Sequence, residues 1–110
     1  MLDRSGWDSR VDDRDGAHIV ILAGEIDLVG AGSLRELLIT QLDRPGATAV
    51  IADVSAVTFI DSAALGALIE ALEHAQRTGR HFTVTGATGR ALRIMQITGL
   101  HDLLTGTPGS

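Results

Sequence analysis

Two apolar segments constrain this fold more than any other feature of the sequence. They run from His18 to Ala23 and from Ala47 to Val54, and both are almost unbroken runs of aliphatic residues of strand length. Such runs are typical of strands covered on both faces, as in a parallel sheet flanked by helices. The sequence therefore predicts an α/β domain with a mostly parallel sheet.

A helical pattern follows each of these segments. In the first, Ser33 and Glu36 fit a capping box at a helix start, and Arg44-Pro45-Gly46 ends the helix. In the second, the pattern predicts a helix from Ser62 to Thr78, with Gly79 as its C-terminal cap. The apolar residues at helical spacing are Leu34, Leu37, Leu38 and Leu42 in the first helix, and Leu65, Leu68, Ile69 and Leu72 in the second.

Four shorter segments complete the predicted elements. His81–Thr85 alternates apolar and polar residues as a strand does, with Phe82 and Val84 facing inward. A third helix is predicted over 90–98, with one more turn over 100–104. A short edge strand is predicted through residues 9–11, joined to the first apolar strand by an Asp-Gly turn.

The predicted order is β-β-α-β-α-β-α in one domain. Right-handed crossovers place the strands around the first two helices side by side and parallel, in a sheet of about four strands. We expect residues 1–16 to hold the edge strand and turn and to be partly flexible. Residues 17–104 then form the core, and residues 105–110 a flexible tail of glycine, proline and hydroxyl residues.

The charged and sulfur-bearing residues exclude several classes of function. All nine basic residues are arginines, they are scattered, and the net charge is −5, which argues against direct nucleic-acid binding. The lack of lysine removes Schiff-base chemistry, and the lack of cysteine removes disulfides and thiolate sites. No apolar run is long enough to insert in a membrane and no signal peptide is evident, so we expect a cytoplasmic protein.

Three aspartates near predicted strand ends are candidates for metal or phosphate chemistry, namely Asp27, Asp53 and Asp61. A phospho-accepting aspartate also needs a lysine, which this chain lacks. We expect Asp53 to end its strand in a turn and Asp27 to lie in a loop. The four histidines lack metal-ligand spacing, and Ser62 lacks the G-x-S-x-G context of a hydrolase nucleophile. We therefore expect no catalytic residue, no metal ligand and no enzyme.

Two glycine pairs keep a nucleotide site open as an alternative. Gly30-Ala31-Gly32 lacks the third glycine of a dinucleotide fingerprint. Gly86-Ala87-Thr88-Gly89 precedes a predicted helix, whose backbone amides would suit an anion, although such a segment is more often a turn.

The segment around Asp61 and Ser62 is the strongest functional candidate. Asp-Ser before an apolar periodic run is a helix N-cap signal. Gly66 lies one turn after Ser62 on the same side of the helix, and Ala63 and Ala67 continue that edge, which leaves room for another surface. The exit of a parallel strand is also where open α/β sheets place binding sites. A phosphate on Ser62 would sit at the positive end of the helix, so it would change binding and leave the fold intact.

The chain resembles the STAS-domain anti-sigma-factor antagonists. The resemblance spans roughly residues 19–104 and depends on the order and spacing of several motifs. These are Gly24-Glu25-Ile26-Asp27, Asp53-Val54-Ser55, Phe59-Ile60-Asp61-Ser62 with Leu65-Gly66, Ala87-Thr88 and Thr98-Gly99-Leu100.

The resemblance implies a phosphorylation switch. It identifies Ser62 with the family's regulated serine, and it implies an anti-sigma factor that is also a serine kinase as the partner. The unphosphorylated chain would bind that kinase and free a sigma factor, and a serine phosphatase would reset the switch. ATP would belong to the kinase, so this chain needs no cofactor. The implied partner-binding residues are Asp27, Asp61, Ser62, Ala63 and Gly66.

The sequence also departs from the family pattern and leaves other functions open. Many relatives read Asp-Ser-Ser/Thr-Gly-Leu-Gly, whereas this chain has Ala63 and Ala64 before Leu65-Gly66, which changes the surface that a kinase would meet. One alternative is a structural STAS subunit of a lipid-transport complex or signalling scaffold, with Asp61-Ser62 as a cap only. Another is a small nucleotide-binding or hydrolysing domain.

Overall fold

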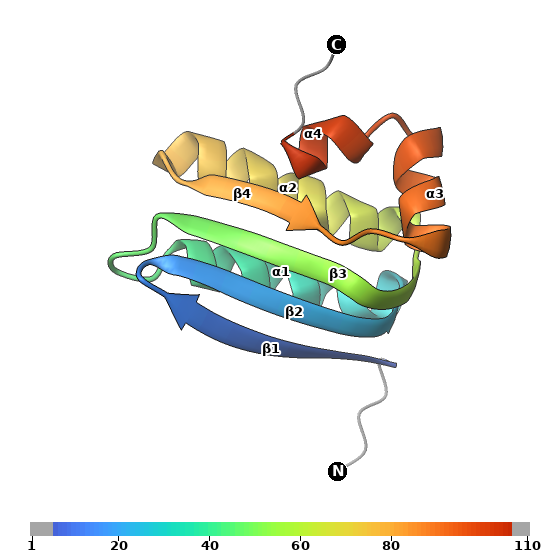
Figure 1. The fold of residues 1–110 in the computed structure, drawn as a ribbon, viewed down its shortest axis with the longest axis horizontal. Coiled ribbons are helices and arrows are strands. Elements are labelled where there is room, and N and C mark those ends of the chain that lie inside the picture. Colours follow the sequence, from blue (N-terminus) through green and yellow to red (C-terminus); the bar gives the residue numbers. More distant parts are fainter. Residues whose placement is uncertain (1–5, 107–110) are drawn as a thin grey trace.

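A four-stranded sheet and four helices make up the fold in the computed structural model, which describes residues 6–106 (Figure 1). The strands are in the order β1-β2-β3-β4, so each strand neighbours the next one in the sequence. The elements are β1 (Trp7–Arg14), β2 (Ala17–Ile26), α1 (Leu28–Leu42), β3 (Ala49–Ile60), α2 (Ser62–Thr78), β4 (His81–Thr85), α3 (Gly89–Ile97) and α4 (His101–Thr105). The order predicted from the sequence is confirmed, and α4 is the additional turn expected near residue 100.

The first two strands form a tight hairpin. They pair antiparallel from Trp7 opposite Gly24 to Arg14 opposite Ala17. The two-residue loop is Asp15-Gly16, and both residues have positive φ, 56° and 91°. Positive φ at both positions is what a type I′ turn requires, and it explains the Asp-Gly sequence. The edge strand is longer than the predicted residues 9–11 because this turn lets the ladder run through polar residues that carry no strand signal of their own.

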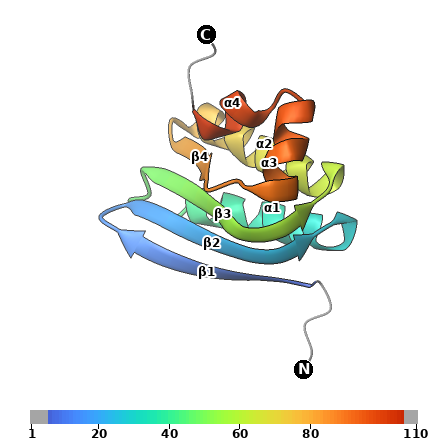
Figure 2. The same ribbon diagram turned by 45° about the vertical axis from the view of Figure 1, so that its right-hand side comes forward.

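The other strand pairs are parallel, as the helical crossovers require. β2 pairs with β3, and β3 with β4. Helices α1 and α2 run side by side across one face of the sheet, while α3 and α4 lie at its β4 side (Figures 1 and 2). Along β2, Val20, Leu22 and Ile26 are buried against the helices, whereas Ile19 and Ile21 are half-buried. The expectation that both faces would be fully covered is therefore wrong for this strand, since an apolar run does not reveal how much of each face a helix reaches.

Helix α1 starts earlier than predicted. It begins at Leu28, and Asp27 is its N-cap, with the carboxylate accepting a hydrogen bond from the Val29 backbone amide at 3.0 Å. Ser33 and Glu36 therefore lie inside the helix, and their capping-box pattern marks no start. Asp27 is a cap and not a loop residue. The two glycines at 30 and 32 do not interrupt the helix because the Asp27 cap and the burial of Gly30 hold its first turn.

Strand β3 is also longer than predicted, since it continues past two irregularities to Ile60. The register shifts opposite Ile21–Ala23 and again opposite Gly24–Glu25, and each shift inserts one extra residue in β3. Asp53 lies at the first of these, where its carboxylate accepts hydrogen bonds from the Ser55 amide at 2.9 Å and hydroxyl at 2.7 Å. The prediction that Asp53 ends its strand in a turn is wrong, since it supports a bulge within the strand.

The second half of the chain matches the sequence pattern more closely. Helix α2 runs from Ser62 to Thr78 and ends at Gly79 with φ 73°, as predicted. Phe82 and Val84 of β4 are buried. Helix α3 covers the predicted span to within one residue at each end. The buried residues of α2 are Ala64, Leu65, Ala67, Leu68, Ala71, Leu72 and Ala75.

Two further findings concern the described part of the chain. None of its helices has the length and apolar character needed to cross a bilayer. The flexibility predicted for parts of residues 1–16 and for residues 105–110 stays a prediction, and residues 1–5 and 107–110 of these segments lie outside the described residues. The domain boundaries at residues 16–17 and 104–105 stay predictions.

Candidate partner-binding site

Two helix starts lie side by side at the carboxyl edge of the sheet. Strands β2 and β3 are parallel neighbours with Ile26 opposite Ile60, and each leads directly into a helix. The Asp61 amide donates a hydrogen bond to the Ile26 carbonyl at 3.2 Å, which joins the end of β2 to the start of α2. Asp27 and Asp61 are therefore brought together from positions far apart in the sequence.

The start of α2 holds Ser62 in a defined position. Asp61 has extended backbone angles and is the N-cap, and its carboxylate accepts from the Ala64 amide at 2.9 Å. Its carbonyl accepts the first helical hydrogen bond, from the Leu65 amide at 2.9 Å. Ser62 is thus the first residue of the helix and its side chain is exposed. The rigid cap orients the serine toward solvent at the end of the helix where the macrodipole is positive.

The helix edge beside Ser62 carries no bulky side chains, but it is shorter than the sequence suggested. A Cβ atom added at Gly66 would meet nothing within 4 Å, so there is open space above this residue. Ala63 is half-buried and contributes to the same edge. Ala67 does not, because it is 2% exposed and packs into the core. The edge that another surface can approach is therefore formed by Ser62, Ala63 and Gly66.

The sequence reading missed two residues at this site. Leu28 and Val29 open α1 and are 74% and 75% exposed. Because α1 and α2 start at the same edge of the sheet, Leu28 occupies the position in α1 that Ser62 occupies in α2. The missed signal was Asp27 as an N-cap, which would have placed both residues in a first helical turn.

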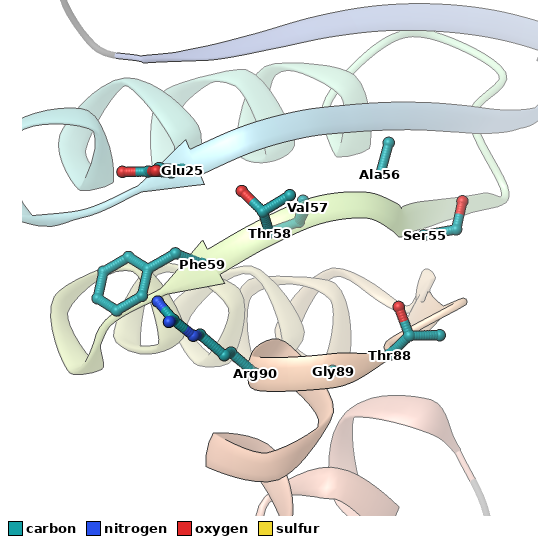
Figure 3. A pocket seen from close by; sticks show the side chains of 9 residues that line it. All are labelled: Glu25, Ser55, Ala56, Val57, Thr58, Phe59, Thr88, Gly89 and Arg90. Carbon is teal, nitrogen blue, oxygen red and sulfur yellow. The ribbon is translucent and has the colours of Figure 1, made fainter.

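A shallow groove of about 430 Å³ lies next to the two helix starts, between β3 and the beginning of α3 (Figure 3). Glu25 and Phe59 line one end, and Arg90 reaches toward Phe59. Ser55 and Thr88 line the other end. The groove is open and mixed in polarity, and none of the predicted site residues lines it.

The glycine pairs considered for nucleotide binding have structural roles. Gly30 and Gly32 lie within α1 and not in a phosphate-binding turn. Gly86 has φ 78°, and a Cβ atom there would lie 2.9 Å from Ser55 Cβ and 3.0 Å from an Asp53 carboxylate oxygen. Gly86 therefore lets the chain leaving β4 pass close to the bulge of β3.

His18 and His74 make short side-chain contacts. Nδ1 of the buried His18 is 2.9 Å from the Gln41 side-chain oxygen, and Nε2 of His74 is 2.7 Å from the Asp43 carboxylate. Within residues 6–106 there is no group of three or more His, Asp or Glu side chains that could hold a metal ion.

Comparison with known proteins shows which family the chain belongs to. The model of the STAS domain matches residues 8–108, which is nearly the whole chain. The chain belongs to the STAS-domain family. The Listeria monocytogenes anti-sigma-B factor antagonist is 30% identical over 95 residues, which are 86% of this chain and 82% of that protein. The resemblance drawn from the sequence motifs is confirmed.

Solved structures agree with this assignment. An anti-sigma factor antagonist from Mycobacterium paratuberculosis superposes with a TM-score of 0.79 at 27% identity, covering 96% of this chain and 87% of that one. The unphosphorylated form of the anti-sigma factor antagonist SpoIIAA superposes with a TM-score of 0.74, covering 86% and 83% of the two chains. SpoIIAA is only 16% identical, so it supports the fold and nothing finer.

Proposed function

We propose that this chain is an anti-sigma-factor antagonist whose binding is switched by phosphorylation of Ser62. The observation that carries the proposal is the exposed Ser62 hydroxyl at the first position of an Asp61-capped helix, beside a low edge. Relatives named anti-sigma-B factor antagonists support the partner class. The unphosphorylated chain binds an anti-sigma factor that is also a serine kinase, which frees a sigma factor. The chain itself acts without catalysis and without a cofactor.

The geometry explains how one phosphate would change binding and leave the fold intact. A phosphoserine carries a charge of about −1.5 to −2 at neutral pH. At the first position of α2 it meets the positive end of the helix macrodipole, and its oxygens remain in water. A partner seated on the edge of Ser62, Ala63 and Gly66 would have to desolvate that charge next to the Asp61 and Asp27 carboxylates. The cost falls on the complex alone.

The proposed contacts divide into two kinds. Ser62, Ala63 and Gly66 provide the close approach, since none of them projects a long side chain. Asp27 and Asp61 provide carboxylates at the two helix starts, where hydrogen-bond donors of a partner can reach them. A serine phosphatase resets the modified form. We place the chain and its partners in the cytoplasm.

The test begins with each anti-sigma factor of the chain's own organism, purified singly and titrated with the unphosphorylated chain by calorimetry. One of them should bind. Incubation of that pair with ATP should then add a single phosphate, mapped to Ser62 by mass spectrometry. The phosphorylated chain should bind about 100-fold more weakly, which corresponds to about 2.8 kcal/mol at 1.4 kcal/mol per tenfold.

Two variants make this test specific. Ser62→Asp should reproduce part of the loss, and Gln76→Glu adds the same charge at an exposed residue near the other end of α2 and should leave affinity unchanged. Unchanged affinity after stoichiometric phosphorylation of Ser62 would rule out the switch. Stable capture of the chain by transporter components, with no anti-sigma factor bound, would favour the structural-subunit alternative.

A further inference from the structure

The exposed apolar residues of this molecule are few, and two of them are adjacent. Among residues 6–106, five large hydrophobic side chains are exposed. Leu28 and Val29 are the only neighbours among them, and at 74% and 75% they are also the most exposed. Single exposed hydrophobics need no explanation, whereas a contiguous pair at a helix start is a candidate contact surface. The other three are Val11, Ile97 and Leu103.

The pair lies next to the proposed phosphorylation site. Leu28 and Ser62 are the first residues of α1 and α2, which pack side by side and start at one edge of the sheet. The axes of packed helices are roughly 8–10 Å apart. A partner surface that covers Ser62, Ala63 and Gly66 therefore needs to extend by only about one helix spacing to cover Leu28 and Val29.

Trp7 of β1 packs against the first turn of α1 and holds it in place. Gly30 is buried, and a Cβ atom there would lie 2.5 Å from Trp7 Nε1, so the indole of β1 packs directly on this turn. The Asp27 cap fixes the same turn from its N-terminal side. The two apolar side chains thus project from a backbone that is ordered before binding, which lowers the entropy cost of using them.

We propose that Leu28 and Val29 are the apolar anchor of the anti-sigma factor complex, while Ser62 at the edge of the same interface provides the switch. The inference depends on the proposed function and adds the chemistry of the partner. The matching surface on the anti-sigma factor is an apolar pocket bordered by basic or N–H groups, because the Asp27 carboxylate caps the turn that carries the anchor and the Asp61 carboxylate caps the neighbouring helix. Affinity and regulation then reside on two neighbouring helix starts.

The anchor is tested by calorimetry of Leu28→Ser and Val29→Ser against the anti-sigma factor that binds the wild-type chain. Each variant should weaken binding by about 10-fold or more, as truncation of a buried interface anchor does. Ile97→Ser is the matched control, since Ile97 is 73% exposed but lies at the end of α3, and it should leave affinity unchanged. Circular dichroism should show the same thermal unfolding midpoint for all of the variants, because the side chains are already in water.

A second measurement separates the anchor from the switch. In Leu28→Ser, phosphorylation of Ser62 should still reduce the remaining affinity by the same factor as in the wild-type chain. Wild-type binding with unaltered affinity in both serine variants would overturn the anchor and leave the proposed function standing. A wild-type chain that binds no anti-sigma factor would overturn both. Self-association of the wild-type chain in sedimentation equilibrium, abolished by Leu28→Ser, would make the pair a contact between copies and would also overturn the anchor.

Discussion

The starts of α1 and α2 are built by the same device and present different surfaces. Each helix follows a parallel strand, and each has an aspartate N-cap in an extended conformation. The residue after the cap is Leu28 in one helix and Ser62 in the other. Gly30, three residues after the Asp27 cap, is covered by Trp7, whereas Gly66 of α2 faces open space. The cap therefore sets the position of each first residue, and the identity of that residue sets the chemistry.

This comparison also separates two uses of glycine in a helix. At Gly30 the missing Cβ makes room for the indole of Trp7, so the residue serves packing. At Gly66 nothing occupies the space, so the glycine contributes nothing to the stability of the free chain. A vacant position on an exposed edge is consistent with a partner that approaches it closely. The two glycines should respond to the same substitution with opposite signs.

The largest effect is expected at Gly30. In Gly30→Ala the new Cβ would clash with the Trp7 ring, and the free energy of unfolding should fall by about 1–3 kcal/mol, measured by urea denaturation. Gly32→Ala is the control, because a Cβ there meets nothing within 4 Å and should raise stability by up to about 1 kcal/mol. If Gly30→Ala remains equally destabilising in a Trp7→Ala background, the clash is not the cause.

The two caps come next. Asp61→Ala should lower the free energy of unfolding by about 1 kcal/mol, because the Ala64 amide loses its acceptor. Asp27→Ala should cost a similar amount through the Val29 amide. Asp61→Asn keeps the acceptor and should retain most of the stability in thermal unfolding. A large loss in the asparagine variant would mean that the charge matters more than the hydrogen bond.

The smallest stability effect is expected at Gly66. Gly66→Ala should raise the free energy of unfolding by about 0.5–1 kcal/mol, since alanine is the better helix former and the position is open. The same variant should bind the anti-sigma factor more weakly in calorimetry, because the methyl group stands on the proposed contact edge. Stabilisation with undiminished binding would move the interface away from this edge.

Local signals along the chain account for much of the fold. The bounds of α2 follow from the Asp61-Ser62 start, the leucine spacing and Gly79, and the structure reproduces them. The buried pair of β4 follows from simple alternation. The Asp-Gly turn likewise follows from the need for two positive φ angles. In each case the interactions that decide the structure lie within a few residues of one another.

Other features depend on residues that are distant in the sequence. The start of α1 was misplaced because Gly30 and Gly32 suggest a loop until Trp7 is seen packing on Gly30. The length of β3 depends on bulges set by its pairing with β2. For α1 the one local signal was Asp27 as an N-cap, and for the bulges of β3 the sequence carries no local signal.

The sequence by itself determined the order of the elements, the family and Ser62 as the candidate phosphoacceptor, because these follow from short motifs and hydrophobic periodicity. Only the tertiary structure decided that the helices capped by Asp27 and Asp61 are neighbours. It also decided that Leu28 and Val29 stay exposed near Ser62, whereas Ala67 is buried in the core. The physical reason is that burial and adjacency come from strand pairing and helix packing between segments more than thirty residues apart. A binding surface therefore depends on contacts between distant segments, whereas a sequence motif depends only on residues that are close together in the chain.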